Sequence, residues 1–221
     1  MREAPRETYR DALSVALTVG AYGVAFGAAG IAAGFSLLQT CLFSLLTFTG
    51  ASQFAAVGVM AASGGVASAV ATATLVSTRN TLYGLQMSPV VQATGLKRVA
   101  AAQITIDEST NVALTQRPRG LGAMRAGFWW TGVGVFVFWN VFTLVGALGA
   151  QALGNPASWG LDAAVPAAFL GLLWPRLTTP FLRVVALISM AFALVVTPWL
   201  PAGIPIIASA LVAFVFGWAE R

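Results

Sequence analysis

The apolar stretch GFWWTGVGVFVFWNVFTLVGALGA, residues Gly127–Ala150, decides the fold class. It contains no charged residue. It is longer than the about 20 apolar residues that a helix needs to cross the hydrocarbon core of a bilayer. The stretch therefore predicts a membrane-spanning helix.

Similar segments fill the rest of the chain, so that about eight apolar runs follow one another. The others are Ala12–Gly34, Leu37–Ala62, Val66–Pro89, Val99–Thr115, Trp159–Trp174, Leu182–Trp199 and Ala202–Trp218. They predict an all-α fold, a polytopic integral membrane helical bundle with about 6–8 membrane segments. Some of these segments can be broken or re-entrant helices. We expect a cytoplasmic N-terminal lead, residues 1–11, and a single transmembrane domain, residues 12–218, with no room for a separate soluble domain.

Composition supports this class and excludes several others. Of the 221 residues 58% are hydrophobic and 9% are charged, against about a quarter charged in a typical soluble domain. The chain has no histidine and a single cysteine, Cys41, which excludes histidine-based catalysis and metal sites, an internal disulfide and a cysteine metal cluster. No P-loop sequence is present. We therefore expect neither an enzyme nor a bound metal or cofactor.

The net charge of +5 comes from residues in the breaks between apolar runs, which indicates membrane orientation rather than nucleic-acid binding. The basic residues assigned to the cytoplasmic side are Arg2, Arg6, Arg10, Arg117, Arg119, Arg125, Arg176, Arg183 and Arg221. They place both termini in the cytoplasm.

Two topologies remain open for the first half of the chain. If every segment spans the membrane, Lys97 and Arg98 lie outside, against the positive-inside rule. If Leu37–Ala62 is a re-entrant pair of half-helices and Val99–Thr115 does not cross, these two residues lie inside. Both alternatives place unusual polarity between residues 47 and 111.

The first polar cluster follows Thr47 and Thr49 and consists of Gly50, Ser52, Gln53 and Phe54. Glycine weakens a helix, and the serine and glutamine side chains offer donors and acceptors. Unwound backbone at membrane depth survives where it lines a cavity, and broken helices there bind charged groups of a substrate. The alternative is a packing site of small residues between helices.

The second polar cluster is Arg79 with its neighbours Asn80 and Tyr83. Arg79 lies deep inside an apolar run, so it needs a partner. The candidates are a substrate carboxylate, Asp107 or Glu108. The alternatives are a structural ion pair or extension of the side chain to the membrane surface.

The acidic pair Asp107 and Glu108 forms the third cluster. On a continuous helix Gln103, Asp107 and Asn111 share one face, which predicts a polar stripe along a water-filled cavity. Without histidine, these carboxylates are the candidates for carrying a proton. The alternative is a solvated face of a helix at the membrane surface.

Five glycines on one face of the first span predict a close helix–helix contact. They are Gly20, Gly23, Gly27, Gly30 and Gly34. The partner in this contact is either another span of the chain or a helix of a second protein.

Several of these motifs, in this order and at this spacing, resemble the AzlC family, the YgaZ-like large subunits of bacterial branched-chain amino acid exporters. The matching motifs are Gly50-Ala-Ser-Gln-Phe54, Arg79-Asn-Thr-Leu-Tyr-Gly84, Asp107-Glu108, Trp139–Gly149 and Leu161–Leu173. The resemblance covers roughly residues 10 to 218. Asn80 departs from the histidine and Ser77 from the asparagine or aspartate that members of the family often have there.

The resemblance implies a permease of the bacterial cytoplasmic membrane that works with a small membrane subunit of the AzlD type. Its implied substrates are valine, leucine, isoleucine and their analogues, which it moves outward. The predicted substrate-binding residues are Gly50, Ser52, Gln53, Phe54, Arg79, Asn80 and Tyr83. We expect the substrate carboxylate at Arg79 or at the half-helix end between Gly50 and Gln53, and the ammonium group at Asp107 or Glu108. We expect the aliphatic side chain in an apolar pocket that includes Phe54, Tyr83 and Trp139. Proton exchange at a carboxylate would drive export.

Two other functions fit the same residues. A channel or facilitator for a small solute would use the broken segment and the polar residues equally well. A non-transporting scaffold would use the glycine face, but it has little need for charge inside the membrane.

Overall fold

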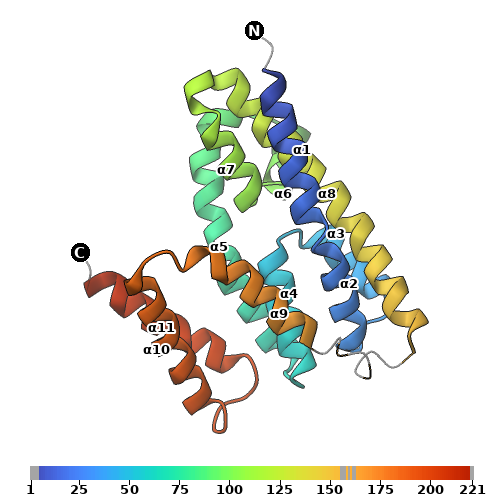
Figure 1. Cartoon of the computed structure of the whole chain (residues 1–221), viewed down its shortest axis with the longest axis vertical. Coiled ribbons are helices and arrows are strands. Elements are labelled where there is room, and N and C mark those ends of the chain that lie inside the picture. Colours follow the sequence, from blue (N-terminus) through green and yellow to red (C-terminus); the bar gives the residue numbers. More distant parts are fainter. Residues whose placement is uncertain (1–4, 155–157, 159, 161–162, 220–221) are drawn as a thin grey trace.

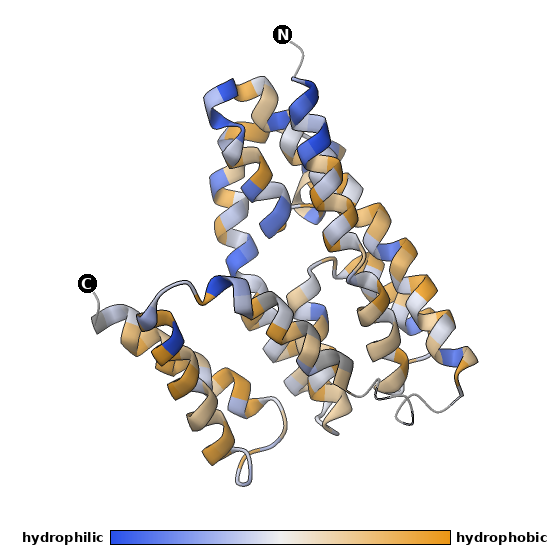
Figure 2. Ribbon diagram, in the orientation of Figure 1, coloured by the Kyte–Doolittle hydropathy of each residue, from blue (hydrophilic) through white to orange (hydrophobic). Residues whose placement is uncertain are grey.

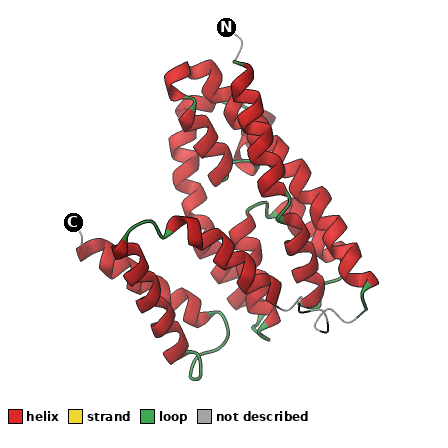
Figure 3. Ribbon diagram, in the orientation of Figure 1, coloured by secondary structure: helices red, strands yellow, loops and turns green. Residues whose placement is uncertain are grey.

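The computed structural model describes residues 5–154, 158, 160 and 163–219, and these residues form helices joined by turns and loops (Figure 3). The helices are α1 (Arg6–Gly20), α2 (Gly23–Ala32), α3 (Leu37–Leu46), α4 (Gly50–Ala61), α5 (Val66–Val91), α6 (Leu96–Gln103), α7 (Asp107–Thr115), η1 (Arg117–Arg119), α8 (Leu121–Ala152), α9 (Ala164–Leu173), η4 (Trp174–Arg176), α10 (Pro180–Val196) and α11 (Ile204–Ala219). The predicted all-α class is confirmed. The basic residues Arg2 and Arg221, and residues 159, 161 and 162 of the predicted Trp159–Trp174 segment, lie outside the described residues.

Two helical segments are long and apolar enough to cross a membrane. One is α8, and the other is Arg6–Ala32, in which α1 and α2 follow one another with a turn at residues 21–22. The two segments lie side by side along most of their length (Figure 1). Orange, apolar residues predominate along α8 and over the lower part of the molecule, and blue ones gather near the N-terminal end (Figure 2).

Glycines allow this close approach. A Cβ atom added to Gly23 would lie 2.4 Å from the carbonyl oxygen of Trp139, and one added to Gly27 would lie 2.0 Å from that of Thr143. In return, a Cβ atom on Gly146 of α8 would lie 2.0 Å from the carbonyl oxygen of Val24. The partner of the predicted glycine face is therefore α8 of the same chain for Gly20, Gly23 and Gly27, whereas Gly30 packs against Thr40 of α3. Gly34, which has φ +88° and no neighbour near its Cβ position, takes no part in this contact.

The segment Leu37–Ala62 forms a hairpin of two short helices, α3 and α4. Ser36 caps α3, because its hydroxyl accepts a hydrogen bond from the backbone N–H of Gln39. The helix ends at Leu46, and α4 begins three residues after Thr47 at Gly50. The beginning of α3 and the end of α4 line the same groove, so the chain returns to the end from which it came (Figure 1).

The segment after α5 forms a second hairpin, α6 and α7, which points in the opposite direction (Figure 1). The helix is interrupted at Ile104–Ile106, where the Ser109 hydroxyl accepts from the Ile106 backbone N–H and donates to the Ile104 carbonyl. The expected single face of Gln103, Asp107 and Asn111 is therefore wrong, because Gln103 ends one helix and Asp107 begins the next.

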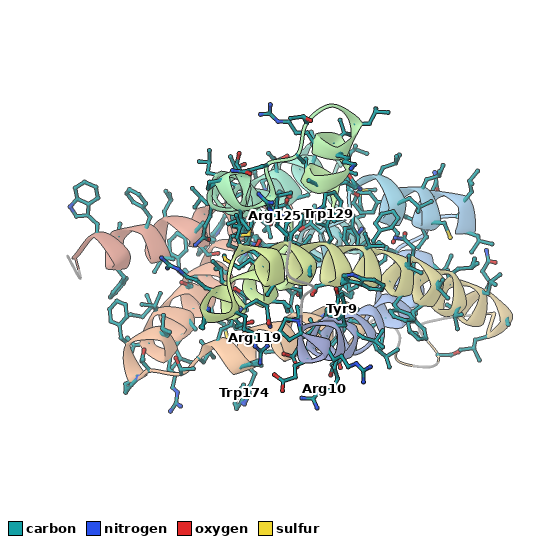
Figure 4. The ribbon with its side chains drawn as sticks, turned by 90° about the horizontal axis from the view of Figure 1, so that it is seen from above. Tyr9, Arg10, Arg119, Arg125, Trp129 and Trp174 are labelled. Carbon is teal, nitrogen blue, oxygen red and sulfur yellow. The ribbon has the colours of Figure 1, made fainter. Side chains whose placement is uncertain are left out.

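Basic residues gather at the end of the molecule that carries the N-terminus. Arg119 forms an ion pair with Glu7 at 2.5 Å, and Arg125 donates to the carbonyl of Val90 at the end of α5. Figure 4 views the molecule from this end and labels Arg119 and Arg125. Lys97 is the second residue of α6 and lines a groove with Val91 and Gln92 at the end of α5, so it lies at this end as well. The hairpin shape of α3 and α4 agrees with the second alternative, and the side of the membrane on which Lys97 and Arg98 lie stays a prediction.

The C-terminal part rises along α9 to η4, and then α10 and α11 pack mainly against each other. α9 contacts α2 and α4. Figure 1 shows the C-terminal end at the left edge of the molecule, far from the N-terminal end at the top. The segment α9–η4 therefore closes one side of the centre of the molecule.

Candidate functional site

A cavity of about 220 Å³ lies at the centre, where the tips of the two hairpins meet. Six parts of the chain line it: the junction of α1 and α2, both tips, α5, α8 and the α9–η4 segment. The lining residues are Val19, Tyr22, Phe48, Thr49, Gly50, Ala51, Phe54, Arg79, Ile106, Asp107, Glu108, Val135, Trp139, Phe169, Leu173 and Arg176. The volume is below the 300–1,000 Å³ typical of drug-sized pockets, so it suits a small solute.

Two helices begin at the cavity. Gly50 and Asp107 are the first residues of α4 and α7, and both line it. The backbone N–H groups of a first helical turn have no partner within the helix and carry partial positive charge. The cavity therefore receives two helix ends that attract an anion.

Two glutamines donate hydrogen bonds to the backbone carbonyls at the tip of the first hairpin. The Gln53 side-chain amide donates to the carbonyls of Ser44 and Thr47 at 3.2 and 3.1 Å. Gln103, from the tip of the second hairpin, donates to the carbonyl of Leu45 at 2.9 Å. These bonds satisfy carbonyl groups at the end of α3 that have no partner within the helix.

Trp139 joins this network to α8. Its indole N–H donates to the Gln53 side-chain oxygen at 3.0 Å. The same indole ring also contacts the space that a Cβ on Gly50 would occupy, at 2.8 Å. A side chain at Gly50 would therefore push the tip of the hairpin away from α8.

The charged side of the cavity is a cluster of two arginines on one carboxylate oxygen. Oδ2 of Asp107 accepts from Arg79 at 2.9 Å and from Arg176 at 2.6 Å. The Asp107 side chain is 8% exposed, Arg79 30% and Arg176 57%. Asp107 is therefore the buried centre of the cluster, and it is the partner of Arg79 that the sequence left open.

Glu108 lines the cavity beside this cluster, and among the described residues it forms no ion pair. The Nε atom of Arg79 is buried and has no hydrogen-bond partner in the described part of the chain. The cavity lining thus includes an arginine with an unused, buried donor and a carboxyl group without an ion pair among the described residues. These are the two groups that a carboxylate and an ammonium ion bind.

The opposite wall of the cavity is aromatic and aliphatic. The ring of Phe54 makes edge contacts with Trp139 and Phe169, with ring centroids 6.2 Å apart in both pairs. Leu173 and Val135 add aliphatic surface. An apolar side chain fits here without leaving a polar group unpaired.

The fold brings five of the predicted site residues to this cavity. They are Gly50, Phe54, Arg79, Asp107 and Glu108. They come from three separate parts of the chain, and Arg79 lies at the middle of α5.

The other four predicted residues lie outside the cavity lining. Gln53 is fully buried in the hairpin network, and Ser52 accepts a hydrogen bond from Ser77 at 2.8 Å. Asn80 lines grooves on another side of α5, and its buried Oδ1 has no partner among the described residues. Tyr83 follows Arg79 by one helical turn.

Arg176 is a residue of the site that the sequence does not reveal. Its position between two apolar runs predicts a cytoplasmic loop charge, but it bonds to Asp107 at the central cavity instead. In the sequence, a basic residue of a surface loop and one that lines a central cavity look the same when both lie in a short connection. Only the folded path of α9 shows that Arg176 lies at the cavity. Two residues of the aromatic wall have a signal in the sequence: Phe54 in the first polar cluster, and Trp139, which falls in the middle of an apolar run beside Asn140.

No group of three or more histidine, cysteine, aspartate or glutamate side chains in the described part of the chain is placed to hold a metal ion. The site consists of charged and apolar side chains with two helix ends. Such an arrangement could bind a small solute that has both charged and apolar groups.

Comparison with known proteins gives one match. A sequence model of the AzlC protein family matches residues 14–153, which include both hairpins, Arg79, Asp107 and α8. The match ends before α9, so Arg176 lies beyond it. No curated protein and no solved structure matches the chain. The chain therefore belongs to the AzlC family, whose members are membrane transporter components with a role related to branched-chain amino acid transport.

Proposed function

We propose that this protein is a secondary transporter that exports branched-chain amino acids across the bacterial cytoplasmic membrane. Residues 12–218 form one transmembrane permease domain that works with a small AzlD-type membrane subunit, and both termini lie in the cytoplasm. Valine, leucine, isoleucine and their analogues are the substrates. The family assignment supports this class of substrate.

The central cavity carries the proposal. It combines an arginine–carboxylate cluster, two helix N-termini and an aromatic wall within one small volume. A branched-chain amino acid has the same three features: a carboxylate, an ammonium group and an aliphatic side chain. Placing a charged side chain inside a membrane costs free energy, so such side chains usually lie along the pathway of a solute.

In the proposed complex the substrate carboxylate binds Arg79 and the N-terminus of α4 near Gly50. The unpartnered Nε of Arg79 supports this assignment. The ammonium group binds Asp107 or Glu108. The aliphatic side chain contacts Phe54, with Trp139 and Phe169 behind it.

Ser52, Gln53, Asn80 and Tyr83 support the site from outside the cavity lining. Gln53 fixes the tip of α3, and Ser52 ties α4 to α5 through Ser77. Glu108 is the proposed proton carrier, since no ion pair within the described residues fixes its charge. Exchange of a proton at this carboxyl group would couple export to the proton gradient.

The test is counterflow of radiolabelled valine in proteoliposomes that contain both subunits. We expect Arg79→Ala and Asp107→Asn each to reduce transport at least about tenfold, because each removes a charge-assisted hydrogen bond of the site. Arg183→Ala is the matched control, because this arginine donates to the Leu177 carbonyl away from the cavity. Wild-type rates in both site variants would refute the assignment of the site.

Coupling is tested separately. An exporter driven by protons stops accumulating substrate when the proton gradient is collapsed, whereas a facilitator shows flux without accumulation in either case. We expect Glu108→Gln to retain counterflow and to lose accumulation, because counterflow needs no net proton movement. Accumulation by this variant at the wild-type level would exclude Glu108 as the proton carrier.

A further inference from the structure

We propose that Arg176 is a gating residue, which leaves Asp107 and pairs with the substrate carboxylate when the site is occupied. The proposal rests on the proposed function, because it uses the same cavity and the same class of substrate. It assigns a role to a residue that lies beyond the matched family region.

The two arginines on Asp107 are held very differently. Arg79 projects from the middle of α5, a helix of 26 residues. Arg176 ends the short turn η4, and the non-helical residues 177–179 follow it before α10 begins. With 57% of its side chain exposed, Arg176 is also the partner with more freedom to move. The Arg79–Asp107 pair is therefore the fixed element, and Arg176 is the displaceable one.

Both arginines use the same carboxylate oxygen. Oδ2 of Asp107 is 2.9 Å from Arg79 and 2.6 Å from Arg176. A substrate carboxylate is chemically equivalent to that oxygen as a partner for a guanidinium group. If Arg176 exchanges Asp107 for the substrate, no charge is left unpaired: Asp107 keeps Arg79, and its other lone pairs become available to the substrate ammonium group. An exchange of partners avoids the large cost of an isolated charge at this depth.

The same segment carries part of the apolar wall. Leu173 and Phe169 precede Arg176 on α9, line the cavity, and bring Phe169 against Phe54. Movement of Arg176 is thus coupled to the surface that contacts the aliphatic side chain. We infer that α9–η4 closes over the substrate. Arg176 then binds the substrate carboxylate, and the residues of α9 limit the size of the side chain that fits.

The first test compares Arg176→Gln, Arg176→Lys and the control Arg183→Gln in valine counterflow with both subunits present. We expect Arg176→Gln to raise KM at least about tenfold, the loss typical of one charge-assisted hydrogen bond. We expect Arg176→Lys to recover part of this loss, because it restores the charge without the planar fork. The control should keep the wild-type KM. A wild-type KM in Arg176→Gln would overturn the proposal.

The second test follows the gate without transport. Cys41 is the only cysteine of the chain, so Cys41→Ser provides a background in which Leu173→Cys introduces a single thiol at the cavity. We expect a membrane-impermeant maleimide to label this thiol several times faster when Arg176→Gln is added. Valine should slow labelling when Arg176 is present and have no effect in its absence. Equal labelling rates with and without Arg176 would overturn the gate.

The two tests separate this proposal from the proposed function. If the wild-type complex shows no valine counterflow, the substrate assignment fails. Faster labelling in Arg176→Gln would then still support a gate, for another solute. If valine counterflow is intact and neither KM nor labelling depends on Arg176, the gate fails and the transport function stands.

Discussion

Replacement of Gln53 by leucine tests how the first hairpin keeps its open tip inside the molecule. The variant Gln53→Leu retains a side chain of similar size but removes three hydrogen bonds. It leaves two backbone carbonyls, those of Ser44 and Thr47, and the indole N–H of Trp139 without a partner. The bonds to Ser44 and Trp139 are buried, so water does not replace them, whereas Thr47 is exposed in a groove where water can replace its bond.

The magnitude follows from the two buried groups, the Ser44 carbonyl and the Trp139 indole N–H. Each buried polar group that loses its partner costs about 1–3 kcal/mol. The apolar leucine side chain offsets part of this cost by its burial. We expect the free energy of unfolding to fall by about 3 kcal/mol, which lowers Tm by about 6–12 °C in a domain of this size.

Gln103→Leu is the matched comparison. Gln103 also donates to carbonyls at the end of α3, at 2.9 and 3.4 Å, but it is only half-buried and lines a groove of about 870 Å³. Water in this groove replaces the lost bonds, so the loss should stay near about 1 kcal/mol or below. Thermal unfolding in detergent, followed by tryptophan fluorescence, measures both variants. A Tm for Gln53→Leu within the error of the wild type, or a larger loss in Gln103→Leu, would refute the reasoning.

Three further substitutions test separate parts of the fold. Gly27→Leu should abolish the folded state, because its Cβ would lie 2.0 Å from a backbone oxygen of α8. Gly84→Ala is the control, because the space around this glycine is open, and only this variant should keep the wild-type elution volume in size-exclusion chromatography. Trp139→Phe retains an aromatic ring but leaves the Gln53 oxygen unpaired, and thermal unfolding should show a loss of about 1–3 kcal/mol; an unchanged Tm would contradict that bond. Arg119→Ala removes a surface ion pair with Glu7 and a hydrogen bond to Gln116, whose oxygen keeps its bond from Thr8, so it should cost about 1–3 kcal/mol, of which high salt reduces only the ion-pair part. An unchanged Tm would contradict this account.

The sequence predicts the apolar elements well because their lengths and hydropathy follow directly from composition. The segments Val66–Pro89 and Gly127–Ala150 lie within α5 and α8, and the break near Gly50 appears where glycine and polar residues interrupt an apolar run. Small residues at spacings of three and four also predict a close helix contact, and α8 supplies its partner.

The second break was harder to predict. Residues Ile104–Ile106 are apolar or β-branched and contain no glycine or proline, so local sequence favours no interruption there. The break is stabilised by Ser109, which caps α7, and by Gln103, which bonds to α3. Both interactions depend on the folded chain. A continuous helix was therefore the natural expectation for Gln103 and Asp107, and it is wrong.

Arg79 and Asp107 could be paired from the sequence because a charge inside an apolar run requires an opposite charge. Arg176 could not be added, because nothing in a short connection shows that the chain returns to the centre after α8. The structural roles of Ser52 and Gln53 could not be predicted from the sequence. A polar side chain that forms hydrogen bonds within the protein looks the same in the sequence as one that contacts a substrate.

The central claim is that one cavity recognises a carboxylate, an ammonium group and an aliphatic side chain together. Competition against labelled leucine, in liposomes that contain both subunits, tests this with three ligands: leucine, leucinamide, which lacks the carboxylate, and isovalerate, which lacks the ammonium group. The account predicts that leucine competes at least about tenfold better than either analogue, and that Arg79→Ala reduces the advantage over leucinamide. Equal competition by all three ligands, or an unchanged advantage in Arg79→Ala, would contradict it.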